Sequence, residues 1–299
     1  RRSGTFGVIV PSSHNPFHAR VISHIQDRLH ARGYGVLVVN SRPAEHGDTS
    51  AVLLLLRHRV EGVLIFPAET SDEYLEVLRD HQVPAVLVGT EPPEPLPAAT
   101  VPSIMCEDEQ GAYLATRHLL EGGCRRIALL LPRQAGQPGR LRQAGYRRAL
   151  QEAGLEPLEL VAPGPDPADL RLGYELAGEL LYRGPEVDGI FAFNDLMAVG
   201  ALRALAEAGV QVPAQVAVVG YDNVEMASYV TPALTTVEIP LEELGRKACD
   251  ILLRVVRGRD AGGGMLREKV QPALVVREST RRAAALGVAG RAEKPAGRG

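Results

Sequence analysis

Polar and aromatic side chains follow the ends of several short apolar runs in this sequence. The residues that share this position are Asn15, Phe17, Arg142, Asn194 and Asp222. Amides, carboxylates and the planar guanidinium group exchange paired hydrogen bonds with hydroxyl groups, and aromatic rings stack on the apolar face of a sugar. These residue types therefore predict a binding site for a small polyhydroxylated molecule.

The asparagine and aspartate residues of this set also have a plainer explanation. Asn and Asp are common N-cap residues, because their side-chain oxygens accept hydrogen bonds from the first turn of a helix. Asn15, Asn194 and Asp222 would then only cap the structure that follows them. For any one residue capping is the better interpretation, whereas its recurrence at several strand ends favours a ligand site.

The common sequence signatures of enzymes are absent. The sequence contains no GxSxG, GxxxxGK[ST], GxGxxG or HExxH motif. His14 and His18 have the i, i+4 spacing of a zinc pair, but Pro16 lies between them, which favours solvated or ligand-facing histidines. We therefore expect no catalytic residue, no metal and no cofactor.

Apolar runs alternate with stretches of helical period along the chain. Strands are expected over residues 6–10, 35–39, 62–66, 84–88, 126–131, 189–193 and 216–220. Helices are expected after the first strand and near residues 48–58, 72–81, 108–121, 140–153, 168–183 and 195–208. This alternation predicts two parallel sheets with helices on both faces, and ligands bind such sheets outside the carboxyl ends of the strands.

Length and composition narrow the class of protein. A chain of 299 residues fits two domains of ordinary size, and 45% hydrophobic with 23% charged residues is typical of a soluble chain. No apolar run approaches the ~20 residues that span a bilayer, and no secretion signal is recognisable. The separated cysteines Cys106, Cys124 and Cys249 favour reduced thiols and a cytoplasmic location. A net charge of -3 predicts that the chain alone does not bind DNA tightly.

The stretch "FNDLMAVGALRALAEAGVQVPAQVAVVGYDNVEMASYVTPALTTVEIPLEELGRKACDILL", closed by "LVVREST", resembles the effector-binding core of the LacI family of bacterial transcriptional regulators. The motifs "NPF", "ATRHLLEGGCRRIALL" and "RQAGYRRALQEAGL" occur in the order and spacing of that family, over roughly residues 5–280. The resemblance implies an α/β fold of the periplasmic-binding-protein-like type I, with two doubly wound parallel-sheet subdomains joined by three crossovers and the effector between them.

The resemblance also implies subdomain boundaries, with crossovers near Gly122, Pro240 and Leu266. The implied N-subdomain comprises residues 5–122 and 240–266, and the implied C-subdomain comprises residues 123–239 and 267–280. Residues 281–299 are rich in Gly, Ala and Arg without an apolar period, so we expect a disordered tail.

Roles for single residues follow from the same resemblance. Arg142, three residues before the glycine of "RQAGY", would grip the effector, and Asp222 of "GYD" would accept its hydroxyl groups. The other pocket residues that the resemblance implies are Asn15, Phe17, Phe191 and Asn194. Phe191 falls inside an expected strand, so a place in the core is an equally good interpretation.

Two features depart from the family pattern. The sequence begins at "RRSGTFG", where the hinge behind a helix-turn-helix would end, so the DNA-reading domain is expected to lie outside it. The usual aspartate–asparagine pair of the family appears here as Glu107 and Asp108, which leaves contacts at that position to be established.

The expected function is that of an effector sensor in a LacI-type regulator. A small carbohydrate or nucleoside would bind between the subdomains and modulate operator DNA binding by the helix-turn-helix. The alternative is the solute-binding protein of a sugar transporter, which shares this fold. Absence of a secretion signal favours the regulator. We expect no membrane partner and a homodimer, with residues 46–58 and 75–78 as candidates for its surface.

Overall fold

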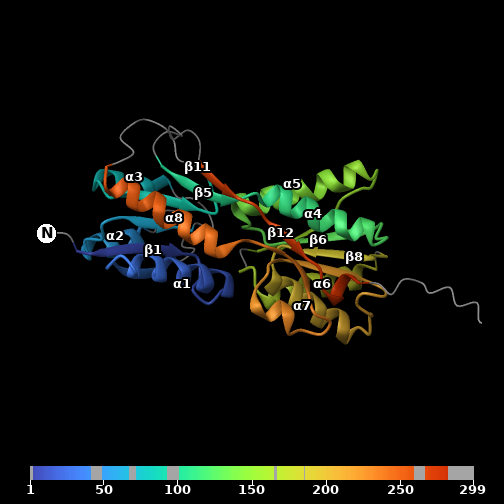
Figure 1. Cartoon of the computed structure of the whole chain (residues 1–299). Helices are drawn as coiled ribbons and strands as arrows, with labels where there is room; N and C mark the ends of the chain where they lie inside the picture. Colours follow the sequence, from blue (N-terminus) through green and yellow to red (C-terminus); the bar gives the residue numbers. More distant parts are fainter. Residues whose placement is uncertain are drawn as a thin grey trace, which may run out of the picture.

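Two six-stranded sheets lie end to end along the molecule (Figure 1), and the computed structural model describes residues 3–41, 49–66, 72–92, 101–164, 167–184, 186–258 and 267–281. The first sheet has the order β11-β5-β4-β3-β1-β2, and the second has the order β12-β10-β9-β8-β6-β7. Every described strand pair is parallel except β10 with β12. The predicted fold class is therefore confirmed.

The first sheet contains β1 (Thr5–Val10), β2 (Gly35–Asn40), β3 (Val63–Ile65), β4 (Ala85–Val88), β5 (Ser103–Cys106) and β11 (Arg267–Val270). The second contains β6 (Ile127–Leu131), β7 (Leu158–Val161), β8 (Gly189–Ala192), β9 (Ala217–Asp222), β10 (Thr235–Glu238) and β12 (Ala273–Val275). Two short 3₁₀ helices follow strands of the second sheet, η1 (Glu225–Ser228) and η2 (Glu278–Thr280).

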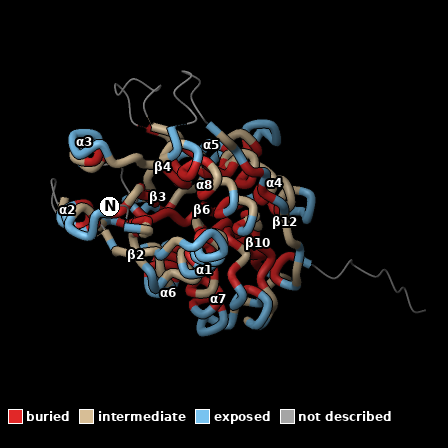
Figure 2. Tube along the Cα trace, turned by 60° about the vertical axis from the view of Figure 1, so that its left-hand side comes forward, coloured by how far each residue is buried: buried red, intermediate tan, exposed pale blue. Residues whose placement is uncertain are grey.

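Helices cover both faces of each sheet. The first sheet lies between α1 (Pro16–His30) with α8 (Leu241–Val256) and α2 (Ser50–Arg57) with α3 (Asp72–Asp80). The second lies between α4 (Asp108–Glu121) with α5 (Gly136–Glu152) and α6 (Leu170–Arg183) with α7 (Asp195–Glu207). Along β1, Val8 and Val10 pack beneath α1 while Ile9 packs beneath α2, because successive side chains of a strand point to opposite faces. Figure 2 shows the resulting buried strands between half-exposed helices.

The chain passes between the two sheets three times, at Glu107, at residues 239–240 and at residues 271–272. Two of these positions differ from those expected. The first crossing precedes α4 instead of following it at Gly122, since α4 packs on α5 and on the second sheet. The third crossing follows Val270 rather than Leu266, since β11 pairs in parallel with β5 of the first sheet. Of the expected tail, only Arg281 belongs to the described residues.

The expected dimer surface is only partly exposed. Leu53 and Leu54 of α2 are 44% and 41% exposed, as a surface role requires. Leu75 and Leu78 of α3 are buried against the sheet with 6% and 1% exposure, so these two leucines do not supply the expected exposed apolar surface. Residues 46–48 lie outside the described part of the chain.

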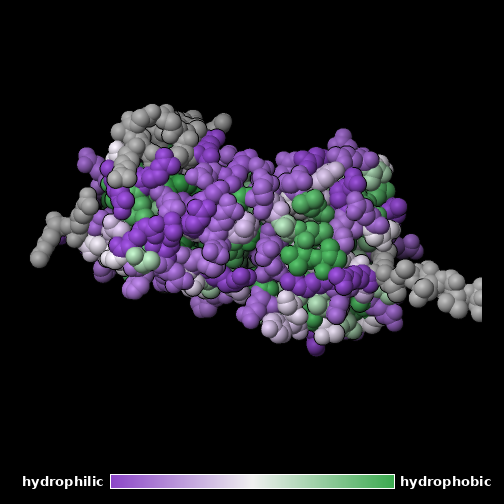
Figure 3. All heavy atoms as spheres, viewed as in Figure 1, coloured by the Kyte–Doolittle hydropathy of each residue, from purple (hydrophilic) through white to green (hydrophobic). Residues whose placement is uncertain are grey.

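The face over α1 and α8, the cysteines and the helix lengths complete the description of the fold. The face over α1 and α8 is mostly hydrophilic (Figure 3), with ion pairs such as Arg28–Asp250 and Lys247–Glu243. The three cysteines are buried and form no disulfide. Among the described residues, no helix combines the length and the apolar character needed to cross a bilayer.

Helices α6 and α7 cross in backbone contact at two glycines. A Cβ atom on Gly173 would lie 2.0 Å from the carbonyl oxygen of Met197, and one on Gly200 would lie 2.0 Å from that of Leu170. Real Cβ atoms do not approach backbone this closely, so any larger residue must push the helices apart. The crossing places the N-terminus of α7, and with it Asn194 and Asp195, at the end of β8.

The two glycines of α6 make a matched test of this packing. We expect Gly173→Ala to lower the free energy of unfolding by about 1–3 kcal/mol, because the added methyl group overpacks the crossing. Gly178 in the same helix has no atom within 4 Å of an added Cβ, so Gly178→Ala should raise stability by up to about 1 kcal/mol through helix propensity. Urea unfolding of both variants measures the difference, and equal effects would contradict the packing argument.

Candidate functional site

The carboxyl ends of strands from both sheets meet where the two halves of the molecule touch. Arg20 of α1 donates from Nη1 to the carbonyl oxygen of Asn223, which follows β9, over 3.1 Å. Gln137 of α5 accepts hydrogen bonds at Oε1 from the Thr90 hydroxyl and the Glu91 N–H, both over 2.7 Å. Thr90 and Glu91 follow β4 of the first sheet. These contacts lie at the edge where parallel α/β sheets bind their ligands.

A buried arginine is the centre of the site on the second sheet. The Nε atom of Arg142 donates to Asp108 Oδ1 over 2.8 Å, and its Nη1 donates to the Phe193 carbonyl over 2.6 Å. The guanidinium carbon lies 3.6 Å from the ring centroid of Tyr221 and 4.7 Å from that of Phe193. The Nη2 atom is 3.7 Å from Asp222 Oδ1, which is too far for a hydrogen bond. Arg142 is thus held on two edges and keeps one donor group directed at Asp222.

The backbone at Asp222 adopts a conformation that side chains other than glycine rarely adopt. Its φ is 105°, and φ of the next residue, Asn223, is 50°. The Asn223 side chain secures this turn, since its Nδ2 donates to Glu238 Oε1 over 3.0 Å and its Oδ1 accepts from Arg277 Nη2 over 2.8 Å. Such strain costs about 1–3 kcal/mol per residue and persists where the surroundings impose it, which is common at binding sites.

A second buried carboxyl group anchors the same turn from α7. Asp195 Oδ2 accepts a hydrogen bond from the Val224 N–H over 2.8 Å, and its Oδ1 accepts one from the Thr236 hydroxyl over 2.5 Å. Gly220 makes room for it, because a Cβ there would lie 2.2 Å from Asp195 Oδ1. Asp195 therefore sets the position of the chain immediately after Asp222.

Burial raises the pKa values of all three carboxyl groups of the site. It raises the pKa of Asp195 to about 7, against hydrogen bonds from Thr236 and Val224 that lower it. Burial also raises the pKa values of Asp108 and Asp222, and in both cases the neighbouring Arg142 charge opposes the increase. Of the described carboxyl groups, Arg142 pairs only with those of Asp108 and Asp222, and the raised pKa of Asp195 favours its protonated form near neutral pH.

The structure brings Arg142 and Asp222 together, but neither lies at an open rim. Arg142 is 5% exposed and Asp222 is 7% exposed. No described residue donates a hydrogen bond to the Asp222 carboxyl group, and η1 begins after Val224, so Asp222 is not acting as a helix cap. Asn15 is the N-cap of α1, where its Oδ1 accepts from the Phe17 N–H over 2.9 Å. Phe17 is half-buried against the core, one turn before Arg20.

Asn194 is a helix cap and Phe191 is a core residue in this structure. Asn194 caps α7, with Oδ1 accepting from the Met197 N–H and Nδ2 donating to the Ala168 carbonyl, each over 2.9 Å. Phe191 has no exposed surface and lies in the core, 6.5 Å from the Tyr221 ring. Both residues therefore support the site through capping and core packing, and neither presents a free polar atom or ring face to a ligand.

Sequence reasoning missed Phe193, Gln137 and Thr90 as residues of this edge. Phe193 is the aromatic ring that Arg142 contacts, and it comes one residue after β8 ends. Gln137 and Thr90 form the contact between the two halves and also follow strand ends, β6 and β4. Phe193 was missed because the expected strand 189–193 included it, whereas β8 ends at Ala192. Thr90 would have been found if the strand-end rule had been applied to β4.

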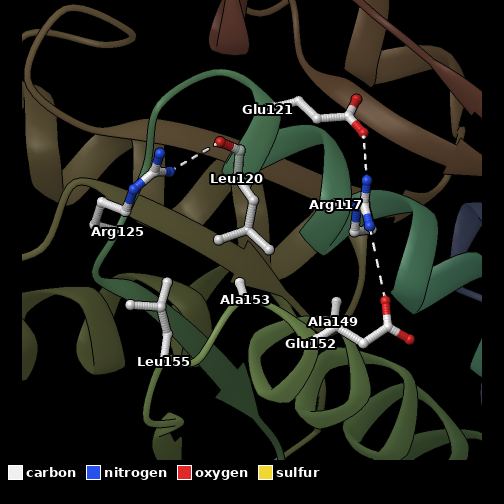
Figure 4. Close-up of a pocket in the computed structure, with 8 residues that line it drawn as sticks. All are labelled: Arg117, Leu120, Glu121, Arg125, Ala149, Glu152, Ala153 and Leu155. Carbon is white, nitrogen blue, oxygen red and sulfur yellow. Dashed lines mark hydrogen bonds and ion pairs between the residues drawn. The ribbon is translucent and has the colours of Figure 1, made fainter.

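A separate pocket of about 270 Å³ lies at the far ends of α4 and α5 (Figure 4). Its lining comprises Arg117, Leu120, Glu121, Arg125, Ala149, Glu152, Ala153 and Leu155. Within it, Arg117 pairs with both Glu121 and Glu152. Arg125 donates to the carbonyl of Leu120. Neither Arg142 nor Asp222 lines this pocket, so it is separate from the site at the strand ends.

Comparison with known proteins gives consistent matches over nearly the whole chain. Residues 116–280 match the family model of a periplasmic binding protein-like domain. The HTH-type transcriptional repressor PurR of Edwardsiella ictaluri is 33% identical over 280 residues, 92% of this chain and 79% of that protein. The ribose operon repressor of Escherichia coli K12 is 32% identical over 252 residues, 83% of this chain and 74% of that protein. The crystal structure of a LacI family transcriptional regulator from Enterococcus faecium with bound ribose matches with a TM-score of 0.80 at 28% identity, covering 92% of this chain and 98% of that one.

The raised pKa of Asp195 predicts a pH-dependent stability. Between its ordinary pKa of 3.8 and about 7 the folded protein keeps a proton that the unfolded chain releases, so stability falls as pH rises through this window, by up to about 4 kcal/mol. Asp195→Asn, which cannot ionise at this position, should flatten the profile relative to that of the unaltered protein. Urea unfolding between pH 4.5 and about 8 tests this, and an unaltered slope in Asp195→Asn would assign the titration to another group.

Proposed function

The chain belongs to the LacI family of bacterial transcriptional regulators, and we propose that it is the effector-sensing core of such a regulator. In this proposal a small sugar-like molecule binds between the two subdomains in the cytoplasm. Its binding changes the affinity of a helix-turn-helix, joined to the N-terminal side of this core, for operator DNA. The similar proteins are named as repressors rather than as transport proteins, which favours regulation over solute uptake.

The arrangement of Arg142 and Asp222 is the observation on which the proposal rests. The Arg142 guanidinium group and the Asp222 carboxylate form an ion pair at 3.7 Å without a hydrogen bond between them, at the edge where the two sheets meet. A hydroxyl group both accepts and donates, so a sugar hydroxyl can accept from Arg142 Nη2 while it donates to Asp222. The rings of Phe193 and Phe17, from opposite halves, are half-buried and can face the apolar side of a sugar ring.

The contact between the halves supplies a route from effector to DNA. Arg20 of the first half bonds the carbonyl of Asn223, the residue directly after Asp222. A ligand that engages Asp222 therefore acts on the same turn that α1 holds. Since an effector shifts a conformational equilibrium only by its differential affinity for the two states, this shared turn is where we place the coupling.

Removal of the Asp222 charge tests the binding site. A thermal-shift screen against carbohydrates and nucleosides, with D-ribose in the panel because a similar structure contains ribose, identifies the ligand. Asp222→Asn should then weaken that ligand by about 1.5–3 kcal/mol, since a hydrogen bond to a charged acceptor is lost. Arg147→Ala is the control. Arg147 is an exposed arginine of α5 that pairs with Glu159 of β7, so the variant protein should bind the ligand as the unaltered protein does.

The same experiment separates binding from stability. Arg142→Ala leaves Asp108 buried without its ion-pair partner, so we expect a loss of several kcal/mol in stability as well as loss of the ligand. At an exposed rim position, Arg142→Ala would weaken ligand binding and leave the stability of the protein unchanged. If Asp222→Asn binds the ligand normally and only the melting temperature changes, the site has been placed wrongly.

We also propose that the core forms a homodimer. Helix-turn-helix regulators read two half-sites of an operator with two copies of the chain, so the cores must pair. Both halves carry exposed apolar side chains that a second copy would cover. In the first half these are Leu53 and Leu54 of α2, beside a hollow of about 530 Å³. In the second half they are Leu170, Tyr174, Met226 and Tyr229.

A charge on α2 should disrupt this dimer. We expect Leu54→Asp to raise the dissociation constant at least roughly tenfold, because a carboxylate would be buried in the interface. Tyr182→Ser serves as a control, since Tyr182 is 93% exposed at the end of α6 and is not among the proposed interface residues. Size-exclusion chromatography with light scattering at micromolar concentration distinguishes the outcomes, and a monomeric unaltered core would refute the dimer.

A further inference from the structure

Asp108 occupies an unusual place for a charged residue. It is the first residue of α4, directly after Glu107, where the chain leaves the first sheet for the second half. Its side chain is 3% exposed and its described ion-pair partner is Arg142 on α5, at 2.8 Å. A carboxylate this deeply buried is costly unless it is paired and hydrogen-bonded. The ion pair between Asp108 and Arg142 is therefore expected to have a role at the proposed site.

The geometry of Arg142 supplies the answer. A buried arginine beside a carboxylate ordinarily closes on it to form hydrogen bonds of about 2.7–2.9 Å. Arg142 instead stays 3.7 Å from Asp222 while it bonds Asp108 through Nε and the Phe193 carbonyl through Nη1. The two bonds fix the plane of the guanidinium group on two edges. The stack on Tyr221 fixes its face.

We propose that Asp108 is a positioning residue that keeps Arg142 from closing onto Asp222, so that Nη2 and the Asp222 carboxylate both remain available to an effector. Asp108 itself does not touch the ligand. The inference rests on the proposed function for its consequence in binding, but its structural part concerns only three side chains of the unliganded protein. Without Asp108, Arg142 would pair directly with Asp222, and an effector would have to break that pair before it could bind.

Two substitutions separate the hydrogen bond of Asp108 from its charge. Asp108→Ala removes the acceptor, while Arg142 keeps Asp222 as a counterion, so the variant retains a compensated charge in the core. Asp108→Asn removes the charge but keeps an amide oxygen that accepts from Nε. Glu109→Ala is the matched control, because Glu109 is the next residue of α4 and pairs with Arg148, another arginine of α5, at the half-exposed surface.

Crystal structures of the ligand-free variants give the first test. We expect the distance from Arg142 Nη2 to Asp222 Oδ1 to shrink to about 2.8 Å in Asp108→Ala and to stay open in Asp108→Asn and Glu109→Ala. A gap that persists in Asp108→Ala overturns the proposal. This arm needs no ligand, so it decides the positioning role even if the protein binds no sugar.

Calorimetric titration with D-ribose, or with the ligand that the screen identifies, gives the second test. Affinity should fall at least roughly tenfold in Asp108→Ala, and the conservative Asp108→Asn should restore most of it. A merely structural role would lower the melting temperature of both variants and leave the dissociation constant alone, which would overturn the inference. Absence of any ligand for the unaltered protein would count against the proposed function, and the crystallographic arm would still decide the role of Asp108.

Discussion

The Arg142 guanidinium group is the constraint on which the second half of the molecule depends. A buried cation must be neutralised, and the groups that surround Arg142 come from α4, from the end of β8 and from β9, which are remote in sequence. A shift of any of these elements would leave a buried charge without its partner, at a cost of several kcal/mol. The site therefore requires α4 to lie on the second sheet, which explains why the chain crosses over at Glu107 before this helix and not after it.

Local sequence signals predicted most of the fold but not the assignment of elements to sheets. The apolar runs and helical periods located the strands β1, β6 and β9 and the helices α4 and α7, because burial on one face imposes a period. The strands β7, β10, β11 and β12 were not among those expected, and each has only three or four residues. The crossovers at Gly122 and Leu266 were misplaced for a different reason. An apolar helix face shows that α4 packs on something, and only the tertiary structure shows on which sheet.

The site was predictable to the extent that strand ends are visible in the sequence. Asp222 and Arg142 follow from that rule, but their burial does not, because it depends on Asp108 and Tyr221 from other elements. The difference between Phe191 and Phe193 depends on where β8 ends. Phe191 is inside the strand and lies in the core, whereas Phe193 follows the last strand residue, Ala192, and contacts Arg142. Asn194 shows that capping and proximity to a site are compatible, since its place at the end of β8 serves both.

The three crossovers make each half of the molecule discontinuous in the chain. The first sheet receives its covering helix α8 and its edge strand β11 only after the second half has been synthesised as far as β10. A ribosome therefore delivers β3 to β5 with apolar residues, including Leu64, Val88 and Ile104, still without the helix α8 that packs against these strands. During that interval the nascent chain exposes surface of the kind that chaperones bind. Neither half can be obtained as a contiguous fragment, and one proteolytic cut between them would leave two covalent connections intact.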